Sequence, residues 1–261
     1  MQIRLNPVTL ITGAGSGIGA GCARELARKS TGGLLLADID EAAISIVADE
    51  LDAAGVSPER VSTLAFDVTD ITRWSQAATF IQSQYGRLDW AVVNTSAANT
   101  QAPAQSDLVD WGQTTSAQLE ATIQSLRTIM PLMAKNTQGG AIVVTTASAA
   151  IKPEPLAPNA APGLLQVMRA ASHEAAQSNV RINAIAPGGA TTPMWNEMPS
   201  FQDLVRETGS ENAAFDKLAQ MPRALARYSQ GADVNRLILM LLAEEMSVSG
   251  ATLVVDGGGA L

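Results

Sequence analysis

The sequence from residue 8 to residue 19 reads Val8-Thr9-Leu10-Ile11-Thr12-Gly13-Ala14-Gly15-Ser16-Gly17-Ile18-Gly19. Its first four residues are apolar or β-branched and predict a buried strand, while residues 21–27 predict a helix. The glycines between them allow a tight turn and let the backbone approach a pyrophosphate closely. They also let the helix pack on the strand with its free N–H groups toward the anion. This order of elements predicts a dinucleotide-binding unit.

A second apolar strand strengthens this prediction. Residues 34–37 are Leu-Leu-Leu-Ala and lead into Asp38, about 20 residues after the turn, where an acid accepts hydrogen bonds from the adenosine ribose. Asp38 repels a 2′-phosphate, and neither Ser16 nor Ile39 supplies a basic side chain to bind one. We therefore predict NAD(H) as the cofactor. The predicted contacts in this half are Gly13, Ser16, Gly17, Ile18, Gly19 and Asp38.

The spacing Thr-Gly-x-x-x-Gly-x-Gly over residues 12–19 resembles the short-chain dehydrogenase/reductase family, and the resemblance runs the length of the chain. It continues in the strand that leads to Asn94, although Thr95 and Ser96 replace the Ala and Gly of the family's Asn-Ala-Gly motif. It ends at residues 254–258, which are similar to the closing strand of the family. The resemblance implies further cofactor contacts at Asp67, Val68, Asn94, Pro187, Gly188 and Thr192.

The order of apolar runs predicts the fold class. Strands are expected near residues 8–12, 33–38, 61–66, 88–93, 141–145, 180–186 and 251–255, with helices between them. This alternation predicts an α/β fold, a Rossmann-type doubly wound parallel seven-stranded sheet with helices on both faces. A chain of 261 residues with 46% hydrophobic residues suits one domain over residues 1–261.

Residues 189–228 resemble the segment that covers the substrate in this family. Apolar side chains such as Met194, Trp195, Phe201 and Phe215 lie among polar ones there, which favours a small apolar substrate. Packing of the same side chains against the body of the protein explains them equally well. Residues 189–228 are therefore predicted to be a lid within the single domain.

Charge and composition exclude several partners. The net charge of −8 disfavours nucleic acid and anionic membranes, because the attraction to phosphates has the wrong sign. The apolar stretches are shorter than a membrane span, and the N-terminus runs into the first strand without a signal-peptide core, so a cytoplasmic protein is expected. The single Cys22 is expected to pack inside rather than react, and no metal site is predicted.

The resemblance implies an Asn-Ser-Tyr-Lys catalytic tetrad, in which Tyr exchanges a proton, Lys lowers the pKa of Tyr, Ser holds the substrate oxygen and Asn anchors a water relay. The Asn position falls on Gln118, whose side chain is one methylene longer. The Ser position falls on Ala147. Thr146 and Ser148 flank it, and a shift of one residue would present either hydroxyl.

The Tyr and Lys positions carry no phenol and no amine. They fall on Ala157 and Ala161 if about three residues are deleted, or on Ala160 and Leu164 without a deletion; the chain has no tyrosine between Ala141 and Arg227. Prolines at 153, 155 and 158 oppose an early helix start. Asn159 is a suitable N-cap with Pro162 in the first turn, so the helix is expected to begin late.

Three other side chains are candidate substitutes for the missing acid–base groups: Ser148, Lys152 and Glu154. A Lys or Glu in a proline-rich loop is more commonly a solvated surface residue. The only histidine, His173, is expected on the far side of the helix from the site. Without the Tyr and Lys, the ordinary family mechanism is not available to this chain. A positioned general acid or base contributes roughly 10²–10⁴ in rate, which is the size of the loss.

Two functions follow from these observations. The sequence alone favours an NAD(H)-binding, non-catalytic subunit, a pseudoenzyme that partners an active sibling. The alternative is an NAD-dependent oxidoreductase of a hydroxyl or carbonyl substrate with non-standard acid–base residues. The tetramers of the family imply a homo- or hetero-oligomer with a chain of the same family. Its interfaces would be the helices near 114–135 and 160–178 and the C-terminal strand and helix, although core burial also explains their apolar residues.

Overall fold

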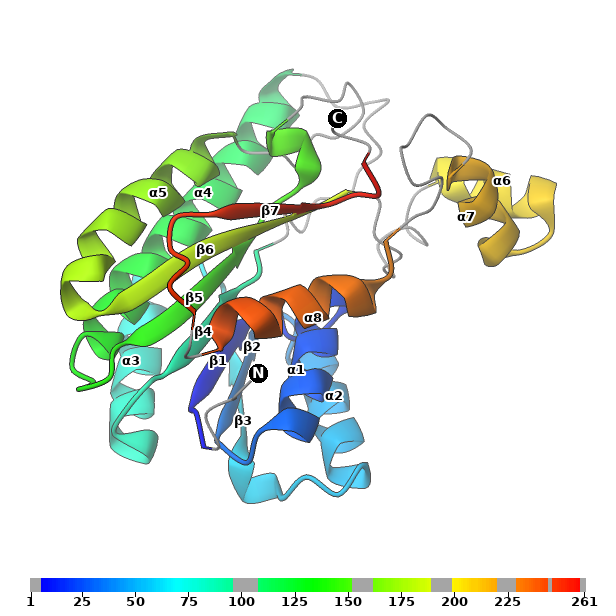
Figure 1. Cartoon of the computed structure of the whole chain (residues 1–261). Helices are drawn as coiled ribbons and strands as arrows, with labels where there is room; N and C mark the ends of the chain where they lie inside the picture. Colours follow the sequence, from blue (N-terminus) through cyan, green and yellow to red (C-terminus); the bar gives the residue numbers. More distant parts are fainter. Residues whose placement is uncertain are drawn as a thin grey trace.

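The computed structural model describes residues 6–95, 108–151, 162–188, 199–219, 229–243 and 246–258. Seven parallel strands form one sheet in the order β3-β2-β1-β4-β5-β6-β7 (Figure 1). The strands are β1 (Thr9–Thr12), β2 (Leu34–Asp38), β3 (Val61–Ala65), β4 (Trp90–Val93), β5 (Gly140–Thr145), β6 (Val180–Pro187) and β7 (Thr252–Val255). The predicted Rossmann-type fold is therefore confirmed, and each strand lies within two residues of its predicted position.

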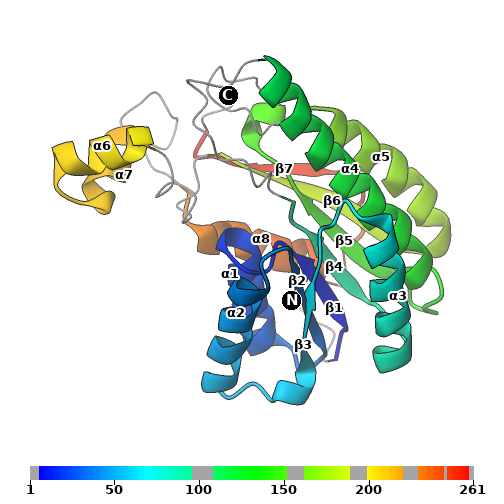
Figure 2. The same cartoon turned by 180° about the vertical axis from the view of Figure 1, so that it is seen from behind.

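Helices cover both faces of the sheet, as the two views in Figures 1 and 2 show. One layer packs through a core that includes Trp74, Ile129 and Met168; the other packs through a core that includes Leu26, Ile44 and Ile238. The first layer consists of α3 (Ile71–Tyr85), α4 (Leu108–Met133) and α5 (Pro162–Ala175), and the second of α1 (Gly17–Lys29), α2 (Glu41–Ala53) and α8 (Gly231–Leu242). The central strands β1 (Thr-Leu-Ile-Thr) and β4 (Trp-Ala-Val-Val) are buried along their whole length, because helices cover both faces of the sheet.

The strand order reverses between β1 and β4. Starting from β1 the chain moves outward to β2 and β3, then returns to β4 on the other side of β1. The crossovers after β1 and β4 therefore diverge to opposite faces, and open α/β sheets bind their ligands at the carboxyl ends of the two strands where this happens. The glycine turn follows β1 and Asn94 follows β4, so both lie at this position.

Two helix boundaries bear on the site. Helix α5 is described from Pro162 onward, and because residues 152–161 lie outside the described residues, its late start stays a prediction. Helix α4 extends to Leu108, about two turns before the predicted start near residue 114, and it accommodates Pro131 within its last turn. Within the described residues, three short 3₁₀ turns join the main elements: η1 (Pro58–Arg60), η2 (Ser148–Ala150) and η3 (Ala176–Ser178).

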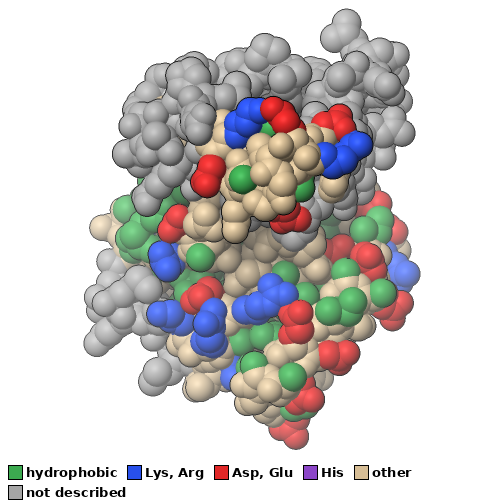
Figure 3. Space-filling model, turned by 90° about the vertical axis from the view of Figure 1, so that its right-hand side faces the viewer, with side chains coloured by type: hydrophobic (Ala, Val, Ile, Leu, Met, Phe, Trp, Pro, Cys, Tyr) green, Lys and Arg blue, Asp and Glu red, His purple; other side chains and the backbone are tan. Residues whose placement is uncertain are grey.

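Helices α6 (Pro199–Thr208) and α7 (Glu211–Ala219) form a hairpin within the predicted lid segment. The rings of Phe201 and Phe215 meet inside it with centroids 4.6 Å apart. An ion pair between Lys217 and Glu207 joins the two helices at 2.5 Å. On the described part of the face in Figure 3, acidic and basic side chains are interspersed with hydrophobic ones.

Candidate cofactor and active site

The glycine turn after β1 is shaped by close backbone contacts. Gly13 has a φ of +60°, and a Cβ at this position would lie 2.3 Å from the main-chain oxygen of Asn94. A Cβ on Gly19 would lie 2.0 Å from the main-chain oxygen of Gly13. Only glycine fits at either position. The turn is therefore packed as a dinucleotide-binding turn requires, with helix and strand in direct contact.

The first turn of α1 points free N–H groups out of the turn. Ser16 is the exposed N-cap residue, and its side chain makes no capping hydrogen bond. No acidic residue lies in the first turn of α1. The helix dipole and the unpaired N–H groups together favour an anion at this end of the helix. The structure thus places Gly13, Ser16, Gly17, Ile18 and Gly19 around one candidate phosphate site.

Asp38 lies beside this turn at the end of β2. Its Oδ2 accepts a 2.9 Å hydrogen bond from the Gly15 main-chain N–H, and its Oδ1 accepts one of 3.1 Å from the Asp40 main-chain N–H. A carboxylate has about four acceptor positions, so two remain for a ligand. The next residue, Ile39, is 63% exposed and offers an apolar surface. Asp38 and the turn are thus joined directly.

Asp67 and Val68 follow β3, the neighbour of β2. Asp67 Oδ1 accepts hydrogen bonds of 2.8 Å from both the main-chain N–H and the hydroxyl of Thr69, while Asp67 itself is exposed. Trp74 fixes Val68 by donating a 2.8 Å hydrogen bond from Nε1 to its main-chain oxygen. Because β2 and β3 are parallel neighbours, both predicted residues lie at the same carboxyl end of the strands as Asp38.

Asn94 connects the ends of β4 and β1. Its main-chain N–H donates to Thr12 Oγ1 at 2.9 Å, and its side-chain Nδ2 donates to the main-chain oxygen of Gly13 at 3.2 Å. Its Oδ1 accepts a 2.8 Å hydrogen bond from the hydroxyl of Thr145. Asn94 was predicted as a cofactor residue; these side-chain bonds engage the turn that would hold the cofactor. The bond from Thr145 has no sequence signal, because a Thr at a strand end is common.

The predicted Asn position, Gln118, faces the end of β4 from α4. Gln118 is buried, and its Nε2 donates to the main-chain oxygen of Thr95 at 3.5 Å. Thr122 lies one turn further along and donates from Oγ1 to the Gln118 main-chain oxygen at 2.9 Å. Gln118 thus lies beside Thr95, the residue that follows Asn94, and its amide is bound to the chain itself.

The Ser position and its neighbours follow β5. Ala147 is half-buried and carries no hydroxyl. Thr146 Oγ1 is shielded from solvent and has no hydrogen-bond partner within the described residues. Ser148 is buried beside Gly188, where an added Cβ would lie 2.3 Å from Ser148 Oγ. Of the two flanking hydroxyls, Ser148 is therefore the one that lies against the turn after β6.

That turn is fixed by β7, since the Gly188 main-chain N–H donates to the Val255 main-chain oxygen at 2.9 Å. Pro187 ends β6, and Gly188 is buried. The remaining residues predicted for the site, Lys152, Glu154, Ala157, Ala161 and Thr192, lie outside the described residues.

Two titratable side chains lie away from the site. Cys22 is fully buried in α1, donates from Sγ to Asn235 Oδ1 at 3.2 Å, and burial strongly raises the pKa of its thiol. His173 is exposed on α5, as predicted. Among the residues that the structure describes, no group of three His, Cys, Asp or Glu side chains could hold a metal ion. No helix of this part is long and apolar enough to cross a membrane.

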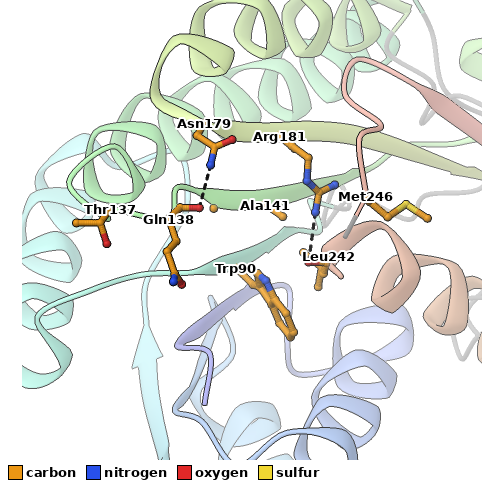
Figure 4. A pocket seen from close by; sticks show the side chains of 9 residues that line it. Trp90, Thr137, Gln138, Ala141, Asn179, Arg181, Leu242 and Met246 are labelled. Carbon is orange, nitrogen blue, oxygen red and sulfur yellow. Dashed lines mark hydrogen bonds between the residues drawn. The ribbon is translucent and has the colours of Figure 1, made fainter. Parts of the chain in front are cut away.

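A cavity of about 420 Å³ lies at the opposite end of the sheet, where β4, β5 and β6 begin (Figure 4). Trp90, Ala141 and Arg181 line it together with Leu242. The Arg181 guanidinium donates to the main-chain oxygens of Leu241 at 2.8 Å and Ala243 at 2.7 Å. It therefore caps α8, and burial lowers the pKa of this side chain. The cavity therefore lies at the end of the sheet away from the glycine turn and Asn94.

A doubly wound parallel sheet with a glycine turn at its switch point defines a nucleotide-binding protein of the Rossmann class. The family model described as short chain dehydrogenase matches residues 7–203. The chain belongs to the short-chain dehydrogenase/reductase family, an oxidoreductase family that uses nicotinamide cofactors. The chain is 28% identical over 255 residues to the 3-oxoacyl-[acyl-carrier-protein] reductase FabG of Thermotoga maritima, with 96% of each chain covered.

Solved structures agree with this assignment. Levodione reductase superimposes with a TM-score of 0.84 at 25% identity, over 98% of this chain and 99% of that one. L-Sorbose reductase from Gluconobacter frateurii, complexed with NADPH and L-sorbose, also has a TM-score of 0.84; it is 22% identical and covers 99% of this chain and 98% of its own. The second likeness shows the fold alone.

Proposed function

We propose that this chain is an NAD(H)-dependent oxidoreductase that interconverts a hydroxyl and a carbonyl group, with acid–base residues that differ from those of its family. The observation that carries the cofactor assignment is Asp38, whose carboxylate is bonded to Gly15 of the glycine turn. Its negative charge lies where a 2′-phosphate would have to bind. Similarity to chains named as reductases favours an enzyme over the non-catalytic subunit that the sequence alone favoured.

The residues of the crevice fit a dinucleotide. The glycine turn would hold the diphosphate against the α1 N–H groups, and Asp38 would accept hydrogen bonds from the adenosine ribose. Ile39 and Val68 would pack beside the adenine, while Pro187 and Gly188 would lie beside the nicotinamide, with Thr192 following. The bound nicotinamide supplies hydride transfer; this chain binds and orients it and handles the proton.

The proton step is assigned to residues around the end of β5. Ser148 lies against Gly188 and is proposed to hold the substrate oxygen. A Ser hydroxyl is too weakly acidic to replace the missing phenol, so Lys152 or Glu154 is proposed as the proton-exchanging group. Gln118 is proposed to take the place of the family's Asn through its amide. Residues 189–228, which include α6 and α7, are proposed to cover the substrate within a single domain.

The second candidate is a non-catalytic NAD(H)-binding subunit. The observation that favours it is the lack of a tyrosine between Ala141 and Arg227, together with Ala147 at the Ser position. A chain of this kind would keep its cofactor turn and its interface while an active sibling carries out the reaction. Thr146, whose buried hydroxyl faces no partner in the described residues, adds no visible replacement.

A groove between α4 and α5 supports a proposed oligomer. The groove has a volume of about 610 Å³, and Ile123, Met130 and Val167 line it. Arg127 and Glu174, which are both exposed, lie at the same groove with opposite charges. A second copy of this chain, placed by a twofold axis, would bring each Arg127 toward the partner's glutamate. This complementarity favours a self-association surface.

Native purification distinguishes the two functions. The chain is isolated from its source, the bound nucleotide is extracted, and co-purifying chains are identified by mass spectrometry. The proposal predicts bound NAD⁺ or NADH and an assembly that contains this chain alone. Recovery of a tetrad-bearing family member in equal amount would instead support the non-catalytic subunit. Bound NADP(H) would contradict the cofactor assignment.

A further inference from the structure

Thr145 ends β5 two residues before Ala147, and its side chain is buried. Its hydroxyl donates the 2.8 Å hydrogen bond to Asn94 Oδ1. The opposite end of the same amide, Nδ2, donates to the main-chain oxygen of Gly13 at 3.2 Å. One chain of hydrogen bonds therefore joins the carboxyl ends of β5, β4 and β1, across the position where the strand order reverses.

The main-chain oxygen of Gly13 is the point where this chain of bonds meets α1. A Cβ on Gly19 would lie 2.0 Å from that oxygen, so the first turn of α1 rests directly on it. On its other side, a Cβ on Gly13 would lie 2.7 Å from Asn94 Nδ2. A shift of Gly13 therefore moves the N–H groups at the start of α1, because close-packed contacts of this kind transmit displacement.

The direction of the Asn94 amide depends on both of its partners. The Gly13 oxygen only accepts hydrogen bonds, so Nδ2 must face it and Oδ1 must face the other way. Oδ1 then needs a donor, and the Thr145 hydroxyl supplies one. A partly buried acceptor that loses its donor is costly, so without this hydroxyl the amide would turn toward water and leave Gly13.

We propose that Thr145 is a positioning residue for the cofactor: it holds the Asn94 amide against Gly13 and so keeps the glycine turn and the α1 N-terminus in the arrangement that binds a dinucleotide. The proposal rests on the cofactor assignment made above. It also links the strand that leads to Ala147 and Ser148 to the phosphate end of the site. If only molecules with an ordered glycine turn bind the cofactor, the apparent affinity falls in proportion to the fraction of molecules whose turn is ordered.

The test compares two isosteric substitutions. Thr145→Val removes the donor, and the matched control Thr146→Val removes a hydroxyl that has no partner among the described residues. Thr145→Ser keeps a donor. NADH binding is measured by nucleotide fluorescence on each purified chain. T145V should bind NADH roughly 3- to 10-fold more weakly, the worth of one hydrogen bond. T146V and T145S should bind as the wild-type chain does.

Hydrogen exchange of the free chain provides a second readout that does not depend on the ligand. In T145V, backbone amide exchange should be faster at residues 13–19 and unchanged at residues 34–38, even if the variant is less stable overall. Equal NADH affinity and equal amide exchange in T145V and T146V would overturn the role proposed for Thr145 and leave the cofactor assignment standing. If the wild-type chain bound neither NADH nor NAD⁺, the cofactor assignment itself would fall, and the role of Thr145 with it.

Discussion

At the scale of single residues, Asp38 is expected to decide between NAD(H) and NADP(H). Its carboxylate accepts N–H groups from Gly15 and Asp40 and retains acceptor positions that suit two ribose hydroxyls. A 2′-phosphate would add negative charge beside it. Neither the exposed Ser16 nor the exposed Ile39 offers a compensating cation. The solved relative that holds NADPH shares the fold at 22% identity, which leaves this residue to decide the cofactor here.

Replacing Asp38 with Asn should narrow the preference. The wild-type chain should bind NADH at least about tenfold more tightly than NADPH, since about 1.4 kcal/mol of repulsion corresponds to that factor. D38N should lose most of this ratio, mainly by binding NADPH better. Asp40→Asn is the control, because it removes a nearby charge while Asn still caps α2 at Ala43. Fluorescence titration checks both; equal binding of NADH and NADPH by the wild-type chain would contradict the assignment.

Single residues also show where prediction from sequence stops. Gly13, Gly19 and Asp38 were predictable because their roles require a residue type at a fixed spacing. Thr145 was not, because its role depends on a neighbour 51 positions away in the chain. Ser148 was predictable as a hydroxyl near the site, but its burial beside Gly188 depends on how β5 and β6 are placed in space.

At the scale of elements, a side chain from β6, Arg181, caps the C-terminal end of α8. Four N–H···O contacts from the Arg181 guanidinium reach the main-chain oxygens of Leu241, Leu242, Ala243 and Val248. The last carbonyls of a helix have no partner within the helix, and a cation at this end also interacts favourably with the helix dipole. Arg181 therefore joins α8 and the segment before β7 to the sheet.

Arg181→Met should destabilise the fold by about 1–3 kcal/mol, because several buried carbonyls lose their donor while the apolar volume is largely kept. Denaturant unfolding measures the change. The control is Arg236→Met, which removes a 74% exposed arginine paired with Asp233 on the outer side of α8. This control should change stability by less than about 1 kcal/mol. A loss in R181M no larger than in R236M would show that the cap contributes little.

Elements were predicted well where the pattern was local. All seven strands appear as predicted because their apolar runs are bounded by turn residues. The late start predicted for α5 from its prolines stays a prediction, because residues 152–161 lie outside the described residues. The first turns of α4, described from Leu108, were missed, because residues 108–114 contain Gly112 and Thr114 and give no clear helical signal. The hairpin of α6 and α7 is held by Phe201 and Phe215, a pairing that periodicity does not reveal.

At the scale of the whole molecule, the groove between α4 and α5 is predicted to join two copies of this chain. Arg127→Glu should shift the purified chain toward smaller species, because like charges would then meet Glu174 of the partner subunit. Glu174→Arg should do the same, and the double variant should restore assembly. Light scattering with size exclusion measures each species. A wild-type chain that is monomeric at micromolar concentration would contradict the interface.

The chain as a whole is proposed to transfer hydride with NAD(H) although no tyrosine lies at the family position. The most direct test supplies purified chain with NADH and the carbonyl compounds for which its relatives are named, a 3-oxoacyl thioester, levodione and L-sorbose, and follows NADH consumption. Gly13→Ala, which would collide with Asn94, reports any contaminating host activity. We expect NADH consumption with at least one compound. It should be lost in G13A and reduced roughly 10²-fold or more in Lys152→Ala or Glu154→Ala. A chain that binds NADH but consumes none of it with any compound would contradict the claim and favour the non-catalytic subunit.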